Sequence, residues 1–585
     1  MTRVARRRTS ALVVASAIVL CMGGCTGPRE YVENGFKVGP NYCPPQAPVV
    51  AQWIDAADPR VRAQSEEPAR WWAVFNDPVL DRLMNVAYRQ NLSLRQAGYR
   101  VLEARAQFAI AQGGFFPQLQ NAVGSYRREG ISRSFFDQWN FGFNLAWELD
   151  VWGRLRRAIA SAENTWDASA DDYDFVLVTL LGVVAANYVQ IRTDQQRIAL
   201  LEKNVKLQER VRDVVRRELE IGQPNVTAVD LNQAESNLMQ TRSQIPQLEA
   251  DVRQANNRLA ILLGVPPVEL QKTLDVWKAE NDQKAEALRK ASAELEQLQE
   301  TGDLSKMEVV HRIEALWKTV ATVYIPTVPK QVAVGIPAEL LRRRPDVREA
   351  ERLAAAQAEQ IGIAEAALYP IFTINGTLGY QAAKLSQLFS SDALNGSVGP
   401  SFQWNLLNYG RIVNNVRLQD ARFQELVVAY QNTVLQADEE VENGLVSFLR
   451  AQERADMLGQ SAMAGERALL VALNRLRVGG VIAFLQYAVV EQALVQQEDL
   501  WAQARGNIAQ GLIQVYRALG GGWEIRLEPE GAAAAAFAVL PGAAEPAEKA
   551  PTPAPNPFEV PEEPPVPPQP APKPVQDRAT TPPKA

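Results

Sequence analysis

Two long runs of the chain contain no proline. Residues 155–221 hold no proline and a single glycine, Gly182, and residues 412–478 again hold no proline. Because proline interrupts a helix, each run predicts one helix of about 65 residues, roughly 100 Å long at 1.5 Å per residue. Helices of this length do not fit inside an ordinary globular domain and are typical of coiled coils or extended helical assemblies.

The two runs belong to two copies of one larger unit. WELDVWGR (147–154) corresponds to WNLLNYGR (404–411), LEIG (219–222) to LRVG (476–479), and LLG (262–264) to LGG (519–521), all at the same spacing along the chain. Each copy predicts a helix, two strands joined by a loop, a very long helix, a turn and a further helix. We place the copies at residues 71–264 and 338–523.

Amphipathic strands precede each long helix. In DQWNFGFNLAWELD (137–150) large apolar residues alternate with small or polar ones, which predicts a strand with two different faces. The apolar face carries Trp139, Phe141, Phe143, Leu145 and Trp147, and in SVGPSFQWNLL (397–407) it carries Phe402 and Trp404. We expect strands at about 117–127, 138–149, 370–381 and 397–407, each long enough to cross a membrane at a tilt.

The N-terminus has the pattern of an export signal. Several arginines precede an apolar stretch, residues 11–20, that is too short to span a bilayer, and Gly23 and Gly24 come directly before Cys25. We predict that residues 1–24 are removed and that Cys25 carries a covalent lipid, followed by an anchored, extended segment over residues 25–70. Ordinary cleavage that leaves Cys25 unmodified is the alternative.

The composition excludes several classes of protein. With one histidine, His311, and three cysteines, the chain offers little for histidine-based catalysis or for a Cys/His metal site. No nucleophile, base and orienting group stand at a recognisable spacing, so we expect no enzyme activity, no metal and no cofactor beyond the lipid. Loss of residues 1–24 removes four arginines and takes the formal charge from −6 to −10, which argues against a nucleic-acid partner.

Two further segments stand outside the repeats. Residues 265–337 are charged and predict a helical insert between the copies. Residues 524–585 are rich in alanine and proline, with sixteen of the 36 prolines after Leu540, which predicts an extended or disordered tail.

Four strands are too few to close a barrel, and open sheet edges are not tolerated in lipid. Three chains would supply twelve strands, an even number within the range of outer-membrane barrels. Trp139 and Trp147 would then lie at the two headgroup levels, with the polar face lining a water-filled lumen. The alternative is a lipid-tethered periplasmic coiled-coil scaffold without a pore, in which the strands pack on a soluble core.

Several motifs resemble the outer-membrane factor (TolC-like) family, and within it the NodT-type efflux lipoproteins. They are VGPNY (38–42), ARWWAVFNDPVLDRL (69–83), WELDVWGR (147–154), IPAELLRRRPDVREAE (336–351), IGIAEAALYP (361–370) and YRALGGGW (516–523). The resemblance covers roughly residues 38–523 apart from most of the insert. It implies a mainly α-helical protein with transmembrane strands, a homotrimer whose twelve-stranded shared β-barrel continues into a long periplasmic α-helical barrel.

The resemblance also implies a function. Such proteins are passive exit ducts in the outer membrane, and a periplasmic adaptor joins them to an inner-membrane pump, here expected to be of the RND type. The adaptor would dock at the turns between the long helices, IGQPN (221–225) and VGGVI (478–482), although these could be hairpin turns only. The expected docking residues are Arg217, Gly222, Gln223, Pro224, Arg475, Gly479, Gly480 and Val481.

Some relatives close this tip with rings of aspartate, but the corresponding stretch here, GGVIAFLQYA, contains no acid. Asp230 is the nearest acidic candidate. We therefore expect a hydrophobic constriction that gates by dewetting, formed by Val481, Phe484 or Leu485.

Overall fold

The computed structural model describes residues 27–63, 69–131, 134–224, 226–280, 324–478 and 483–527, with scattered positions between 286 and 316. These residues all lie in one compact unit, within residues 1–543, and residues 544–585 lie outside the described part. The predicted signal peptide, Cys25, the turn residues Gly479 to Val481 and nearly all of the predicted tail also lie outside it. The described chain reaches Leu527, four residues past the expected boundary at 523, and these residues pack on the helices, since Ile525 is buried and Arg526 pairs with Asp174.

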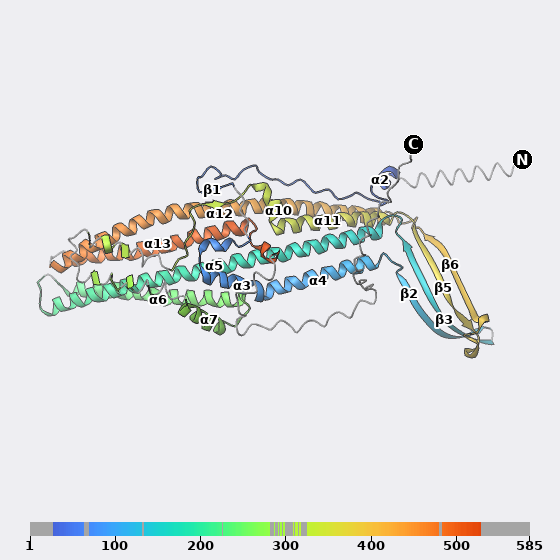
Figure 1. Ribbon diagram of the computed structural model, residues 1–585, viewed down its shortest axis with the longest axis horizontal. Helices are drawn as coiled ribbons and strands as arrows, with labels where there is room; N and C mark the ends of the chain where they lie inside the picture. Colours follow the sequence, from blue (N-terminus) through green and yellow to red (C-terminus); the bar gives the residue numbers. More distant parts are fainter. Residues whose placement is uncertain are drawn as a thin grey trace, which may run out of the picture. The chain divides into compact units, whose positions relative to one another are not determined.

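Long helices dominate the described unit and run side by side (Figure 1). The two proline-free runs form α5 (Arg154–Glu220) and α12 (Arg411–Val478), of 67 and 68 residues. Each turns back into a shorter helix, α6 (Ala228–Leu262) after α5 and α13 (Ala483–Ala518) after α12. Since α4 (Leu92–Gly113) and α11 (Pro345–Ala366) also match in length, the structure repeats as the sequence does.

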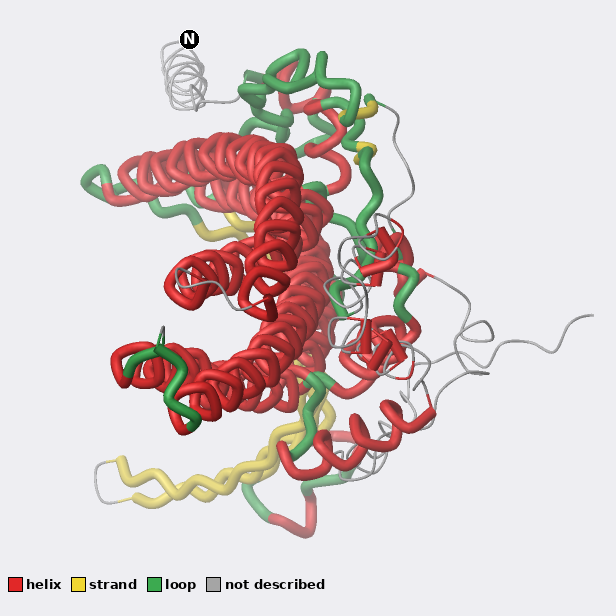
Figure 2. Tube along the Cα trace, turned by 90° about the vertical axis from the view of Figure 1, so that its left-hand side faces the viewer, coloured by secondary structure: helices red, strands yellow, loops and turns green. Residues whose placement is uncertain are grey.

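Most of the smaller elements lie beside the middle of these helices, and the first of them lies at one end (Figure 1). They are α2 (Pro28–Glu33), β1 (Val61–Arg62), η1 (Trp71–Phe75), α3 (Pro78–Gln90), α7 (Pro267–Glu280), β4 (Val332–Ala333), η2 (Pro337–Glu339), α10 (Leu340–Arg343) and η5 (Trp523–Leu527). The N-terminal segment pairs with the end of the insert, because β1 and β4 form a short parallel ladder. The tube view shows the long helices side by side in a curved arrangement, with most loops and short helices along one side of it (Figure 2).

Side-chain caps explain where several helices begin. Asp77 accepts hydrogen bonds from the backbone N–H groups of Val79 and Leu80 at the start of α3, and Asn91 accepts one from Leu94 at the start of α4. Thr227 and Asp230 form a reciprocal capping box at the start of α6. These caps satisfy backbone donors that the helices leave free.

The main apolar core lies where the two repeats meet. Trp71 and Trp72 are almost fully buried, and the Trp71 ring stacks on Tyr516 of α13 at 5.5 Å between ring centroids. One stretch of α5 is apolar enough to cross a membrane, but 61% of that window is buried. Because α5 packs against α4, α6, α11 and α13, its apolar stretch serves the helix core of this unit.

Four long strands form one antiparallel sheet at the opposite end of the long helices from the α5–α6 turn (Figure 1). They are β2 (Leu119–Ile131), β3 (Ser134–Leu149), β5 (Ile371–Ala382) and β6 (Leu394–Gln403), with the loop between β5 and β6 carrying η3 (Leu385–Gln387) and η4 (Ser391–Ala393). The order is β2-β3-β5-β6, so the two hairpins of the two repeats join through β3 and β5. In this chain β2 and β6 are the edges.

The predicted fourth strand, 397–407, is wrong at both ends. The observed β6 begins three residues earlier and ends at Gln403, which pairs with Ile371, the first residue of β5. Trp404 and Leu406 have no strand partner beyond that point. The apolar alternation in this stretch therefore continues past the end of the ladder.

Candidate functional site

The sheet keeps the two faces that the alternation predicts. Trp139, Phe141 and Phe143 lie on one face of β3, and their partners on β5 are Ala382, Tyr380 and Leu378. Phe141 and Phe143 remain 46% and 45% exposed within this chain, and Phe402 of β6 remains 69% exposed. Exposed aromatic side chains along one sheet face suit contact with lipid.

The opposite face carries uncharged polar side chains that bond across the strands. Thr373 and Ser401 lie 2.7 Å apart between their hydroxyl oxygens, Asn375 Nδ2 donates to Ser401 Oγ at 2.7 Å, and the Thr377 and Ser397 hydroxyls lie 2.9 Å apart. Such hydroxyl and amide rows suit a surface that faces water. The two faces thus differ as those of a membrane barrel do.

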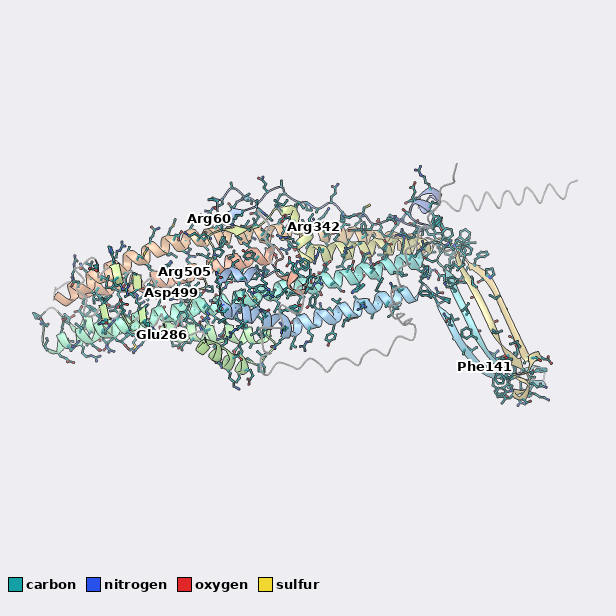
Figure 3. All side chains as sticks on the ribbon, viewed as in Figure 1. Arg60, Phe141, Glu286, Arg342, Asp499 and Arg505 are labelled. Carbon is teal, nitrogen blue, oxygen red and sulfur yellow. The ribbon has the colours of Figure 1, made fainter. Side chains whose placement is uncertain are left out.

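Aromatic side chains mark both ends of the apolar face. At the far end the Trp139 ring contacts Tyr126 with centroids 4.5 Å apart, and the Phe141 ring contacts Phe389 at 5.8 Å (Figure 3). Trp147 lies eight residues along β3 from Trp139, about 26 Å at 3.3 Å per residue. This span, shortened by strand tilt, is close to the apolar band of about 25 Å that outer-membrane barrels present.

Three tryptophans join the sheet to the helices. Their indole N–H groups each donate to a backbone carbonyl: Trp147 to Phe115 at 3.2 Å, Trp152 to Pro370 at 2.8 Å and Trp404 to Leu368 at 2.9 Å. Trp404 was predicted to face the membrane on a strand, but it is half-buried at this junction instead. An amphipathic ring with a satisfied N–H is well suited to an interfacial position.

The N-terminal segment is fixed to the same junction. Arg157 of α5 is fully buried, and its guanidinium donates to the carbonyls of Val38 and Gly39 and to the Glu359 carboxylate at 2.6–2.7 Å. A side chain at Gly362 would overlap Arg157, so glycine there makes room for the guanidinium. The chain that follows Cys25 is thus held beside the inner end of the sheet.

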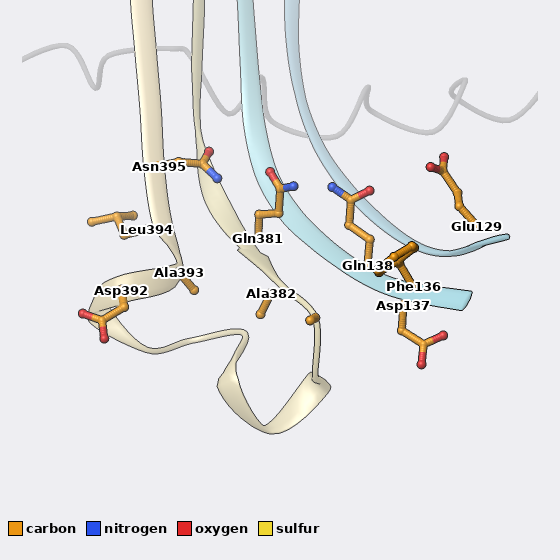
Figure 4. Close-up of a pocket in the computed structure, with 11 residues that line it drawn as sticks. Glu129, Phe136, Asp137, Gln138, Gln381, Ala382, Asp392, Ala393, Leu394 and Asn395 are labelled. Carbon is orange, nitrogen blue, oxygen red and sulfur yellow. The ribbon is translucent and has the colours of Figure 1, made fainter. Parts of the chain in front are cut away.

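The loop ends of the strands enclose an open depression of about 420 Å³ (Figure 4). Its lining includes Glu129, Asp137 and Asp392 as well as the amides of Gln138 and Gln381. Asp137 accepts a hydrogen bond from the Tyr126 hydroxyl at 2.9 Å. In the part of the chain that the structure describes, no cluster of three or more His, Cys, Asp or Glu side chains is placed to hold a metal ion.

The turn between α5 and α6 ends the helices at the tip. Gly222 has a φ of +72°, and its N–H donates to the Leu219 carbonyl while that of Gln223 donates to Glu218. These two bonds form a Schellman motif, in which glycine tolerates the left-handed backbone. Gln223 and Pro224 are exposed, so the turn leaves polar backbone and side chains open to a partner.

The arginines next to the two turns are also exposed. The Arg217 guanidinium donates to the Asp213 carbonyl at 3.2 Å, and Arg475 lies on the surface of α12. Gly479, Gly480 and Val481 lie outside the described residues. The structure therefore places half of the expected docking surface, Arg217 to Pro224, at one continuous tip.

The comparisons with known proteins identify the family. The family described as "Outer membrane efflux protein" matches residues 83–265 and 336–521, more than half of the chain. The chain belongs to the outer membrane efflux protein family. This family consists of export channels and not of enzymes, so the chain is an outer-membrane efflux channel with a large periplasmic part.

Individual members of the outer membrane efflux protein family agree in length and fold. The chain is 28% identical to the pyoverdine export outer membrane protein OpmQ of Pseudomonas putida, over 79% of this chain and 90% of the relative. It is 26% identical to the probable outer membrane lipoprotein SilC of Salmonella typhimurium, over 83% and 95%. The solved outer-membrane channel OprN, 30% identical, aligns over 83% of this chain and 99% of its own with a TM-score of 0.70. The predicted family, fold class and location are thereby confirmed.

The constriction residues lie differently from what the sequence suggested. Phe484 is only 9% exposed and packs inside a cluster with Leu207, Leu473 and Tyr487, so its side chain is not available to line a pore. Leu485, by contrast, is 64% exposed. The backbone N–H and the hydroxyl of Thr227 both donate to the Asp230 carboxylate in the capping box. This carboxylate therefore has a local role at the start of α6.

Sequence reasoning missed two buried polar layers inside the helix bundle near the tip. In one, the Lys203 ammonium of α5 lies 2.6 Å from Glu498 of α13 and 3.7 Å from Glu466 of α12. In the other, Glu491 of α13 accepts a hydrogen bond from the Tyr487 hydroxyl at 2.7 Å. Glu491 and Glu498 are seven residues apart on a largely apolar helix, and that spacing is the signal that could have indicated buried acids.

Proposed function

We propose that the chain is one third of a homotrimeric exit duct in a tripartite export system. The observation that carries this proposal is the four-stranded sheet whose outer strands, β2 and β6, have one unpaired edge each in a single chain. In lipid each unsatisfied backbone group costs several kcal/mol, so such edges need a partner. Three copies joined edge to edge would give a closed barrel of twelve strands without any bare edge.

The mass of the detergent-solubilised protein tests the trimer. Light scattering, corrected for bound detergent, is expected to give three chains per particle from the outer-membrane fraction. Planar-bilayer recordings of the same sample are expected to show discrete conductance steps. A monomer without conductance would contradict the proposal and would favour the lipid-tethered scaffold.

We propose further that Cys25 carries the lipid. The support is positional, because the segment that begins two residues later is held at the sheet–helix junction: the Tyr31 hydroxyl donates to Val151 at 2.7 Å, and Arg156 donates to Gly35 and Phe36. A lipid at Cys25 would therefore start at the membrane level. Mass spectrometry of the N-terminal peptide is expected to show an acylated Cys25, and Cys25→Ser is expected to lose that mass. An unmodified cysteine there would refute the assignment.

The tip is the proposed docking surface for a periplasmic adaptor that connects to an inner-membrane pump of the RND type. Gly222, Gln223 and Pro224 form its exposed turn, flanked by Arg217 and, on α12, by Arg475. A photocrosslinker at Gln223 is expected to capture the adaptor in intact cells. The same crosslinker at Tyr126, at the far end of the sheet, is the matched control and is expected to capture none. Equal capture at both positions would count against docking at the tip.

For the constriction we propose Leu485, together with Val481 outside the described residues. The support is the 64% exposure of Leu485, which leaves its side chain free to face the channel axis, whereas Phe484 is packed within the chain. Leu485→Ser is expected to raise single-channel conductance because a polar ring resists dewetting. Unchanged conductance would remove Leu485 from the gate.

A further inference from the structure

A chain of buried polar side chains connects three helices close to the tip. The Gln208 amide of α5 donates from Nε2 to the Thr241 hydroxyl of α6 at 3.0 Å and also bonds to the Glu491 carboxyl of α13. The Tyr487 hydroxyl donates to Glu491 Oε1 at 2.7 Å. All four side chains are at most 5% exposed. We name this set, Thr241, Gln208, Glu491 and Tyr487, the Glu491 joint.

The Glu491 joint holds an acid whose hydrogen-bond partners, Tyr487 and Gln208, are both neutral. By contrast, Glu498, two turns further along α13, lies 2.6 Å from the Lys203 ammonium. The apolar cluster around the joint, including Leu207 and Leu494, keeps water away from it. An ionised carboxylate in such a place loses hydration that neutral donors only partly replace.

Charges on the surrounding helices do not replace a direct cation. On α6 the joint meets Thr241 and the neighbouring Asn237, which are both neutral. Arg210 of α5 and Glu466 of α12 act with opposite sign on Tyr487. The nearby Lys203 is already engaged with Glu466 and Glu498. Burial therefore dominates and raises the pKa of Glu491 to about 7.

A second observation favours the neutral acid. Gln208 Oε1 is buried and accepts no hydrogen bond in the described structure. A protonated Glu491 supplies one O–H donor, while an ionised one supplies none. The joint thus contains a buried acceptor without a donor next to a carboxyl that could provide one.

The joint lies between α13 and the hairpin whose turn forms the tip. Glu491 is eight residues from the start of α13 at Ala483, about 12 Å along the helix axis. Its hydrogen bonds connect α13 to the hairpin of α5 and α6, whose turn is the exposed tip. Any motion of α13 away from that hairpin must break these bonds and admit water to the carboxyl.

We propose that the Glu491 joint is a proton-dependent brake on tip opening: the neutral carboxyl holds α13 against the α5–α6 hairpin, and its ionisation releases α13. The proposal rests on the proposed function, because it assumes a tip that opens. The direction follows from linkage. The packed state favours the protonated acid, so rising pH through the Glu491 titration shifts the equilibrium toward the state in which the carboxylate is hydrated.

Hydrogen exchange on the protein in nanodiscs tests the joint without relying on conductance. After correction for intrinsic exchange rates, peptides covering residues 483–494 are expected to lose protection as pH rises from 6 to 8. One titrating group changes the opening equilibrium by at most about tenfold per pH unit between its pKa in the open state and its pKa of about 7 in the packed state, and the response flattens above the packed-state pKa. Glu491→Gln, a neutral replacement of the same shape, is expected to stay protected throughout. A flat response in the unmodified protein, or an unaltered response in this variant, would overturn the proposal.

Two further variants keep the test decisive. Tyr487→Phe removes a donor that stabilises the ionised acid, so the midpoint of the response is expected to move to higher pH; an unmoved midpoint would contradict the joint. Glu349→Gln is the matched control, because burial also raises the pKa of Glu349 to about 7, but on α11, outside the joint. This variant is expected to leave the pH-dependent hydrogen exchange of residues 483–494 unchanged. Loss of that pH dependence in Glu349→Gln would refute its assignment to Glu491.

Conductance recorded on the same samples tests the proposed brake separately from the proposed duct. Channels whose open probability rises with pH in the unmodified protein, but not in Glu491→Gln, support the brake. Trimers that conduct equally at pH 6 and 8 refute the brake and leave the proposed duct intact. Monomers without conductance refute the duct, while the hydrogen-exchange comparison still decides whether Glu491 controls helix separation.

Discussion

Buried polar side chains connect the helices at both ends of the bundle, but their hydrogen bonds and charges are satisfied differently at the two ends. At the membrane end, Arg157 is fully buried and meets two carbonyls and one carboxylate, so its donors find acceptors at short range. Toward the tip, Lys203 lies between two acids and Glu491 has only neutral donors. Complete pairing fixes a junction, whereas incomplete pairing leaves an arrangement whose stability depends on protonation.

The difference corresponds to what each end must do. The membrane end holds the N-terminal segment, the start of α5 and α11 in one fixed relation, which a barrel wall inserted in lipid requires. The tip end, on the proposed function, opens by separation of its helices. We therefore expect substitutions at the membrane end to reduce stability at every pH, and substitutions near the tip to have effects that depend on pH.

The largest effect is expected from Arg157→Met. It removes the cation paired with the buried Glu359 carboxylate and the guanidinium donors to the Val38 and Gly39 carbonyls, of which Gly39 keeps the hydrogen bond from Asn34 Nδ2. Breaking a buried ion pair in this way typically costs about 3–5 kcal/mol. Thermal unfolding in detergent is expected to shift down at both pH 5 and pH 8, by less at pH 5 because Glu359 can take up a proton there, and the loss of the guanidinium contacts to the backbone remains at both. Limited proteolysis is expected to cut the released N-terminal segment.

The double variant Arg157→Met with Glu359→Leu is the control for this experiment. It removes both charges and is expected to recover part of the loss, since an apolar pair can replace a buried ion pair. A single variant as stable as the original protein would show that the membrane end is not fixed by Arg157.

The next effect is expected from Lys203→Met, on the order of 3 kcal/mol at pH 8, because the buried acids Glu466 and Glu498 would lose the ammonium that lies between them. The loss is expected to shrink at pH 5, where the two acids can take up protons. Melting curves at the two pH values measure this difference. A loss independent of pH would break the contrast between the two ends.

The sequence predicts the long helices and the sheet faces because their signals are local. Absence of proline and an internal repeat place α5 and α12 within a residue of their observed ends, and strict alternation assigns Phe141 and Phe143 to one face. The end of β6 is not a local property. Alternation continues through Trp404, but pairing stops at Gln403 because β5 begins at its partner, Ile371.

The candidate site was predicted less completely, because the burial of its side chains depends on packing between distant segments. Gly222 could be placed in a turn from the sequence, since few other residues adopt its backbone conformation. Phe484 and Leu485 are adjacent apolar residues on one helix, and only packing against α5 and α12 shows that Phe484 points inward. Arg157 gives no sign of burial in the sequence, because its acceptors, two backbone carbonyls and the Glu359 carboxylate, belong to two distant segments.

A smaller effect is expected at the turn itself. Gly222→Ala puts a side chain on a residue with a φ of +72°, which costs about 1 kcal/mol even though no atom would collide with it. Hydrogen exchange of residues 215–224 is expected to quicken several-fold. Gly222→Asn, which tolerates this conformation better, is the control and is expected to lose less. Equal losses would mean that backbone strain does not set the stability of the tip.

The smallest effect is expected from Glu349→Gln, which separates the cost of a buried acid from its role in opening. Burial and then the neighbouring Asp172, Asp346 and Asp171 raise the pKa of Glu349 to about 7. Because the folded pKa lies above the unfolded one, near 4.3, the carboxyl destabilises the fold increasingly as pH rises toward 7. The neutral variant is therefore expected to melt higher at pH 8 and nearly unchanged at pH 5. The gain should be under about 1 kcal/mol, because the side chain is only half-buried and water screens it. Equal gains in melting temperature at both pH values would assign the effect to packing. Loss of the pH-dependent hydrogen exchange of residues 483–494 in this variant would show that Glu349, and not only Glu491, affects the opening of the tip.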